Sequence, residues 1–401
     1  MRPKSDKFEE KYEKKSNFIC IYQKKVVPLH GFPNMGYNTL NIALLEEFMQ
    51  KGSISGQESG IIGVYKDAIS PYVEDDIVTD VLGNCISHIK ANTYTKEKPE
   101  PRKIMLVAHA DEVGLMVSHI DERGFLYFQE SGAVDSQILQ GVEVDVEGKE
   151  GKWIRGVIGK KPIHFQKKQC EGNENKTEDL WIDIAAAEIK DDNGNTVTTA
   201  KAWAEDHVEL GTQVVFYRHM EESKQEGVYN GAGFDDKIGL YILVELAKRL
   251  NGKVLNSDIY LVASTQEELG GRGASVAAAK IKPNECIVVD VTHATDYPTV
   301  SVEQYGDIKL GGGPVLFSGP NIHKEIYQKL QNKAGKVKYQ KEPLAKPTGT
   351  DANAIQITGE GIATAVVGIP CRYMHTPNER ISMNDVEKAI DILEAYITKN
   401  D

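Results

Sequence analysis

Residue types that commonly bind metal ions follow four short apolar stretches of this sequence, IMLVAHAD, DIYLVASTQEELG, CIVVDV and ATAVVGIPCRYMH. The stretches lead, in order, to His109 with Asp111, to Glu267 and Glu268, to Asp290, and to His375. The carboxyl ends of buried parallel strands share one edge of an open α/β sheet, where ligands bind, so we expect these side chains to meet. Asp235, in NGAGFDDKIG just ahead of a helical pattern, is a further candidate.

This set of two histidines and several carboxylates, without cysteine, suits one or two divalent cations such as zinc, cobalt or manganese. A hydrolytic metal site also needs an open position for water and a base that is not itself a ligand. The adjacent Glu267 and Glu268 repel each other unless a cation or a shared proton compensates, and they divide naturally into a base and a ligand. A solvated acidic turn is the alternative explanation of that pair.

The remaining candidates also have ordinary explanations. In HADE, Asp111 is close enough to His109 to hold its tautomer, although a histidine that caps the surface would fit too. One carboxylate of Asp235–Asp236 would normally cap the following helix, which leaves the other free to bridge metals. Asp290 ends an apolar strand, where a buried carboxylate must be paired or coordinated. His375 lies in a loop just after a strand. Jointly, these residues indicate a metal centre.

Composition excludes several classes of protein. The chain has 401 residues, which predicts two domains or one large domain with an insert, and its net charge of −12 argues against binding to nucleic acid or anionic membrane. Its five cysteines are widely spaced and contain no C-x-x-C pair, which is typical of a reduced, cytoplasmic protein. We find no apolar run near the roughly 20 residues that span a bilayer.

The sequence divides into three kinds of segment. Residues 1–36 are rich in lysine and glutamate, and we expect a flexible N-terminal extension. Residues 37–119 and 217–401 carry α/β patterns, which predict a mainly parallel central sheet with helices on both faces. Residues 120–216 alternate in the manner of β-strands, contain an Asn193–Gly194 hairpin signal, and hold no metal-type cluster. We therefore expect an inserted β-rich domain. Ser382 and Asp385 predict a capping box at the last helix.

From Tyr37 to about Ile397 the sequence resembles the tetrahedral aminopeptidases of metallopeptidase family forty-two, also catalogued as glutamyl aminopeptidases and historically as endoglucanases. The matching segments occur in the family's order: TDVLGN, VAHADEVGLMV, GVIGKKPIHF, FDDKIG, QEELGGRGA, VVDVTHATD, GGGPVL, GTDANAIQ and RYMHTPNE. The resemblance implies a zinc-peptidase-like α/β fold whose inserted domain is PDZ-like or barrel-like. It also implies that this insert mediates self-association into a hollow homo-dodecamer.

The resemblance implies a role for each candidate residue. The implied metal ligands are His109 and Asp290 for one ion, Glu268 and His375 for the other, and Asp235 as the bridge between them. Glu267 would be the general base, and Asp111 would orient His109. Family members usually carry arginine where this chain has Lys237, and lysine cannot reproduce the two-pronged hydrogen bonding of a guanidinium group.

The implied activity is removal of N-terminal residues from short peptides by two divalent ions, zinc or cobalt first, with water activated by Glu267. An amidohydrolase or deacylase of the same fold is the nearest alternative. A β-1,4-glucanase would use two carboxylates without a metal, which leaves His109 and His375 without a task. A non-enzymatic metal-binding oligomer would not need Glu267 as a spare base. The sequence leaves the preferred N-terminal residue and the physiological metal open.

Overall fold

The protein is described here from a computed structural model that covers residues 40–73, 77–95, 100–165 and 176–398. The predicted flexible extension, residues 1–36, lies outside the described residues. No helix within the described ranges is long and apolar enough to cross a membrane.

An eight-stranded sheet forms the centre of the fold, with strand order β1-β2-β14-β3-β15-β18-β16-β17. In that order the strands are Val78–Thr79, Cys85–Ile89, Ser257–Ser264, Arg102–His109, Glu285–His293, Ala363–Cys371, Val315–Ser318 and Gln340–Pro343. The four strands β14, β3, β15 and β18 are mutually parallel, whereas β2 runs antiparallel to β14 and β16 runs antiparallel to β18. The mainly parallel sheet predicted from the apolar runs is confirmed.

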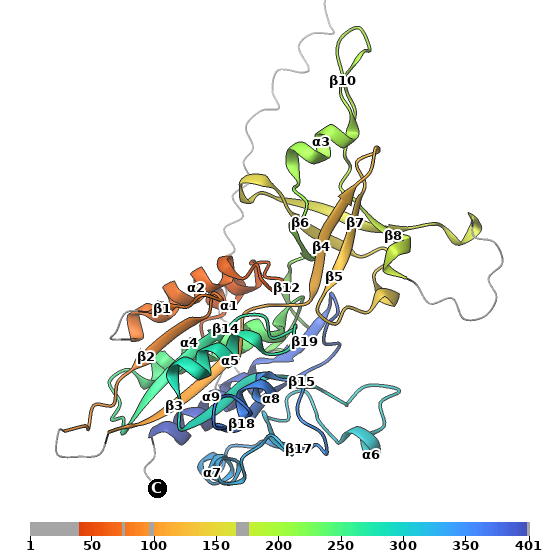
Figure 1. Cartoon of the computed structure of the whole chain (residues 1–401). Coiled ribbons are helices and arrows are strands. Elements are labelled where there is room, and N and C mark those ends of the chain that lie inside the picture. The colour runs from red at the N-terminus through yellow and green to blue at the C-terminus, as the bar shows by residue number, and fades with distance from the viewer. Residues whose placement is uncertain (1–39, 74–76, 96–99, 166–175, 399–401) are drawn as a thin grey trace, which may run out of the picture. The chain divides into compact units, whose positions relative to one another are not determined.

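Helices pack against both faces of this sheet, as predicted (Figure 1). The alternation of β3 shows the two faces. Its residues Ile104 and Leu106 join the apolar cluster that includes α4 (Phe234–Leu250) and α9 (Met383–Thr398), along with α1 (Ile42–Met49), α2 (Ser59–Ile69) and α7 (Lys324–Ala334). Its residues Met105 and Val107 face the opposite cluster, with α5 (Arg272–Ile281) and α8 (Asp351–Gln356). A short helix, α6, spans Val302–Tyr305.

A closed antiparallel barrel with strand order β11-β4-β5-β8-β7-β6 lies between β3 and α4 in the chain. Its strands are, in chain order, β4 (Gly114–Ile120), β5 (Leu126–Ser131), β6 (Glu143–Glu147), β7 (Trp153–Lys160), β8 (Leu180–Asp183) and β11 (Gln213–Phe216). The barrel has an apolar core of its own, and Figure 1 shows its strands as a group distinct from the central sheet. Its first strand, β4, starts directly after the loop that carries Asp111. The domain boundaries stay a prediction.

The insert also contains a hairpin and a helix. The hairpin pairs β9 (Ile189–Lys190) with β10 (Thr196–Thr198) around the Asn193–Gly194 turn, which confirms that signal. The helix α3 (Ala200–His207) was not expected in this β-rich segment. Thr199 caps it, because its side chain accepts a hydrogen bond from the backbone N–H of Ala202.

A three-stranded antiparallel sheet, β12-β13-β19, lies beside the start of α4. It consists of Met220–Glu222, Val228–Gly231 and Glu379–Ser382. Strand β13 leads into the loop of Asp235, and β19 follows the loop of His375. Pairing of Gly231 with Glu379 therefore brings these two loops together although they are far apart in the sequence.

The predicted capping box of Ser382 and Asp385 is wrong. Both carboxylate oxygens of Asp385 instead accept hydrogen bonds from backbone N–H groups of another loop, at Gly311 (2.7 Å) and Gly313 (2.6 Å). A buried loop N–H that lacks a backbone partner binds the nearest available acceptor, so tertiary contacts override the local pattern here.

Candidate metal centre

All five predicted ligands gather in two groups that share Asp235. The groups are His109, Asp235 and Asp290, and Asp235, Glu268 and His375, and in each group the ligand atoms lie within 4.8 Å of one another. The first group is fully buried, whereas Glu268 and His375 are half-buried. The centre therefore has a closed side and a side that opens toward solvent.

Asp235 presents one oxygen to each group. Its Oδ1 lies 3.0 Å from His109 Nε2, and its Oδ2 lies 3.1 Å from His375 Nε2. Ligand atoms about 2.1 Å from a tetrahedral zinc ion are themselves about 3.4 Å apart, so this spacing suits coordination. A carboxylate that faces two ligand groups with different oxygens has the geometry of a bridging ligand.

The other two carboxylates complete the groups. Glu268 Oε1 lies 3.3 Å from His375 Nε2. Asp290 Oδ1 lies 3.7 Å from His109 Nε2. Asp290 does not end its strand, since β15 continues to His293, but its side chain still points to the centre.

His109 is oriented mainly by a backbone carbonyl. Its Nδ1 lies 2.9 Å from the main-chain oxygen of Asp111 and 3.5 Å from the Oδ1 of the same residue. A proton on Nδ1 would be donated to that carbonyl, which leaves the Nε2 lone pair directed at the centre. The predicted role of the Asp111 carboxylate in orienting His109 stays a prediction.

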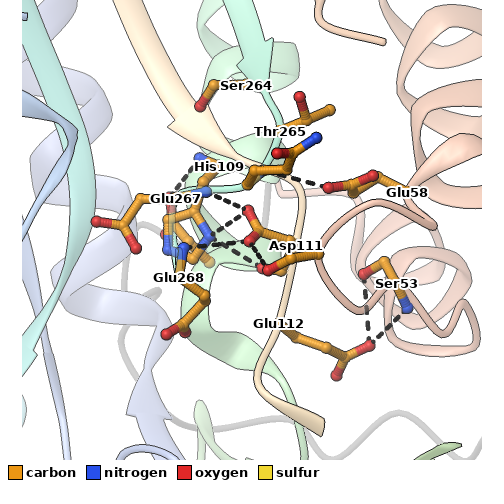
Figure 2. A network of polar contacts seen from close by, with 12 residues as sticks. Ser53, Glu58, His109, Asp111, Glu112, Ser264, Thr265, Glu267 and Glu268 are labelled. Atoms are coloured by element: carbon orange, nitrogen blue, oxygen red, sulfur yellow. Dashed lines mark hydrogen bonds and ion pairs between the residues drawn. The ribbon is translucent and has the colours of Figure 1, made fainter. Parts of the chain in front are cut away.

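The Asp111 carboxylate also holds the loop of the two glutamates. Its Oδ1 accepts the backbone N–H of Glu267 at 2.9 Å, and its Oδ2 accepts that of Glu268 at 3.1 Å and the hydroxyl of Ser55 at 2.6 Å. Figure 2 shows Asp111 beside His109, Glu267 and Glu268. One buried carboxylate thus connects a ligand of the first group with a ligand of the second.

Side chains also hold the two preceding backbone N–H groups of this loop. Asn84 Oδ1 accepts the N–H of Thr265 at 2.9 Å, and Glu58 Oε1 accepts that of Gln266 at 3.2 Å. Gln266 has a positive φ of 56°, which a residue with a Cβ adopts only when its surroundings hold it. Four consecutive N–H groups after β14 are therefore bound by side chains rather than by a sheet or a helix.

The electrostatics indicate an excess of negative charge that cations would neutralise. Burial raises the pKa of Glu267 to about 10, and Asp290 and Asp351 add to this effect. Burial likewise raises the pKa of Asp290 to about 6. Burial lowers the pKa of His375, but hydrogen bonds with Asp235 and Glu268 outweigh this effect and raise the pKa to about 11. These firmly held protons neutralise negative charge that divalent cations would otherwise neutralise, and bound cations would displace them. The donor set fits the metals that the sequence predicts.

Lys237 and Glu112 form a buried ion pair beside the centre, with Lys237 Nζ 2.8 Å from Glu112 Oε1. Glu112 also accepts the backbone N–H of Ser53 at 3.0 Å. Lys237 thus has a defined partner. The pair ties the loop after β3 to the start of α4.

The barrel approaches the centre at Gly132. A Cβ at this position would lie 3.2 Å from Glu268 Oε2 and 2.9 Å from Val113 Cγ1. Gly132 also has a positive φ of 78°. Although none of the five predicted ligands lies in the insert, the insert limits the space around one of them.

Sequence reasoning did not assign roles to Glu58, Asn84, Glu112 or Glu379, which bind the backbone or side chains of the site's loops. Three of them, Asn84, Glu112 and Glu379, lie inside the segments TDVLGN, VAHADEVGLMV and RYMHTPNE of the family resemblance. Their presence in those segments was the sequence signal that could have identified them as residues of the site.

Comparison with known proteins gives a consistent result. The family model described as M42 glutamyl aminopeptidase matches residues 89–392. A lysyl aminopeptidase of Pyrococcus furiosus is 33% identical over 362 residues, which cover 88% of this chain and 96% of that protein. The structure of an aminopeptidase from Desulfurococcus kamchatkensis matches with TM-score 0.78 and 29% identity, over 90% of this chain and 94% of that one. The TET1 peptidase of Pyrococcus horikoshii, described as assembling into a tetrahedron or an octahedral shell, matches with TM-score 0.74 and 26% identity, over 90% and 99% of the two chains.

We predict that Gly132→Ala weakens metal binding, because the added Cβ would overlap Val113 and crowd Glu268. Gly141→Ala is the matched control: Gly141 has a positive φ of 84°, similar backbone strain is expected there, and nothing lies within 4 Å of its added Cβ. Metal content after dialysis, measured by mass spectrometry, should fall for Gly132→Ala only. Equal metal content in the two variants would show that the barrel does not constrain the centre.

Proposed function

The chain belongs to the M42 glutamyl aminopeptidase family, and we propose that its metal-dependent aminopeptidase activity removes residues from the free amino end of short peptides at the centre of His109, Asp235, Glu268, Asp290 and His375. The observation that carries this assignment is the position of Asp235, whose two oxygens face the two ligand groups. Two ions held at one bridging carboxylate are a common arrangement in aminopeptidases.

The metals supply one part of the chemistry. When bound, two divalent cations, zinc or cobalt first, would polarise the peptide carbonyl and make water a stronger acid. Nitrogen and oxygen ligands accept several ions, so availability would decide which metal is used.

Glu267 is the proposed general base. It belongs to neither ligand group, yet it adjoins the ligand Glu268, and the hydrogen bonds to Asp111 hold the backbone of both. Its carboxylate would take the proton from the attacking water and return it to the leaving amine. Asp111 would act indirectly, because it fixes the loop of Glu267 and Glu268 and orients His109.

A substrate amine bound at the same centre would explain the restriction to the amino end of a peptide. The side-chain preference at that position depends on other residues, because the matching family model is described as glutamyl and a relative as lysyl. An amidohydrolase or deacylase reaction would use the same ligands and the same base, and is the second candidate.

We further propose that the barrel mediates assembly into a homo-dodecamer, which would limit access to short peptides. The TET1 relative supports this, since it can assemble into a tetrahedron or a large octahedral shell. A cytoplasmic location also stays a prediction.

The function is tested by removing and restoring metal. Chelation should abolish release of the N-terminal residue from a short peptide, and zinc or cobalt should restore it. The matched substrate is the same peptide with an acetylated amino end, which should not be cleaved. Equal cleavage of the acetylated peptide would favour the deacylase or amidohydrolase alternative, and activity that survives full metal removal would contradict a metal mechanism.

Substitution of each glutamate separates the base from the ligand. Glu267→Gln should retain both metals but lose a factor of about 10²–10⁴ in kcat, the usual contribution of a positioned acid–base group. Glu268→Gln should instead lower metal affinity, with activity partly recovered in excess metal. Metal analysis and steady-state kinetics together decide the matter, and the opposite pattern would reverse the two roles.

The assembly is checked by light scattering. We expect a homo-dodecamer at micromolar concentration, because the barrel domain is expected to pair copies of the chain. A fully active monomer would contradict the proposal, while leaving the metal chemistry unaffected.

A further inference from the structure

Glu379 binds the backbone of two predicted ligands, Asp235 and His375, without belonging to either ligand group. Its side chain is buried, at 2% exposure, at the first position of β19. Its Oε2 accepts the backbone N–H of Asp235 at 3.2 Å, and its Oε1 accepts that of His375 at 2.9 Å. One carboxylate thus binds two segments of which the first lies 144 positions earlier in the chain.

Both of these N–H groups belong to irregular backbone. Asp235 (φ −77°, ψ 105°) lies within α4 by position but has non-helical angles. His375 has a positive φ of 60°, which is unfavourable for a residue with a Cβ. Buried backbone N–H groups outside regular elements need other acceptors, and Glu379 supplies one oxygen to each.

Glu379 itself is held in place by two strand pairings. It lies opposite Gly231 in the β13–β19 pair, which ends four positions before Asp235. The loop that carries His375 is closed by two hydrogen bonds between Arg372 and Arg380, each 3.0 Å long. The carboxylate therefore has a fixed position relative to both loops.

We propose that Glu379 is a positioning residue that sets the separation of Asp235 and His375, and through Asp235 the geometry of both metal positions. The proposal rests on the metal roles assigned above to these two residues. It parallels the position of Asp111, whose carboxylate binds the backbone N–H groups of Glu267 and Glu268. Two buried carboxylates, Asp111 and Glu379, would then hold the backbone of three predicted ligands and of the proposed base.

The chain offers a matched control for this role. Asp385 is also a buried carboxylate with two backbone N–H partners, on Gly311 and Gly313, but it binds no ligand loop. Glu379→Gln and Asp385→Asn each replace one acceptor oxygen with an NH2 group, which faces an N–H donor. Both variants lose the same kind of interaction, and only the first loses it at the metal centre.

The test is a cobalt titration of the metal-free, full-length protein, followed by the visible absorption of the bound ion. We expect Glu379→Gln to bind cobalt about 10–100-fold more weakly at both positions, the usual cost of losing a group that supports metal ligands, with a changed absorption spectrum. Asp385→Asn should bind like the wild type with an unchanged spectrum. Circular dichroism verifies that each variant is folded.

Wild-type cobalt affinity and spectrum in folded Glu379→Gln would overturn the proposal, as would equal losses in both variants. If Glu379→Gln does not fold, Glu379→Asp is titrated instead, because it keeps both oxygens but draws them back by one methylene group; the same outcomes decide. Cobalt binding is measured without a peptide, so a protein that lacks aminopeptidase activity would still show whether Glu379 positions the ligands.

Discussion

The metal centre depends on a requirement of the backbone. The loops that carry Glu267, Glu268, Asp235 and His375 leave regular structure near the edge of the central sheet, where their N–H groups need acceptors. Buried carboxylates of Asp111 and Glu379, with Glu58 and Asn84, supply them. The acceptors that satisfy the backbone thereby determine where the ligand side chains point.

The use of carboxylates as backbone acceptors concentrates negative charge around the metal centre. Besides the ligand carboxylates, Glu379 and Asp351 are buried, and burial raises the pKa of Asp351 to about 7 and that of Glu379 to about 8. Lys237 neutralises one of these buried charges, that of Glu112. Divalent cations would offset the remainder, so metal binding and the folding of these loops are expected to be coupled.

The strand order explains how distant segments meet. Strand β14 lies between β2 and β3, and β15 lies between β3 and β18, so the loops after the four parallel strands β14, β3, β15 and β18 open at one edge. The chain enters the barrel directly after β3 and leaves it ahead of α4. Within the barrel domain, Gly132 lies close to Glu268. An insert at that point can act on the centre without supplying any of the five predicted ligands.

The sequence by itself determined the fold class and the candidate ligands, because short apolar runs that end in carboxylate or imidazole are local patterns with a direct physical meaning. It also identified the Asn193–Gly194 hairpin, which depends only on neighbouring residues. The roles of Glu58 and Glu379 were decided by tertiary structure, since their backbone partners lie 208 and 144 positions away. Asp385 shows the same limit, because its predicted local cap gave way to a distant loop. The pairing of Gly231 with Glu379 joins segments that are far apart in the sequence, and this pairing brings the Glu379 carboxylate to the N–H groups of the ligand loops.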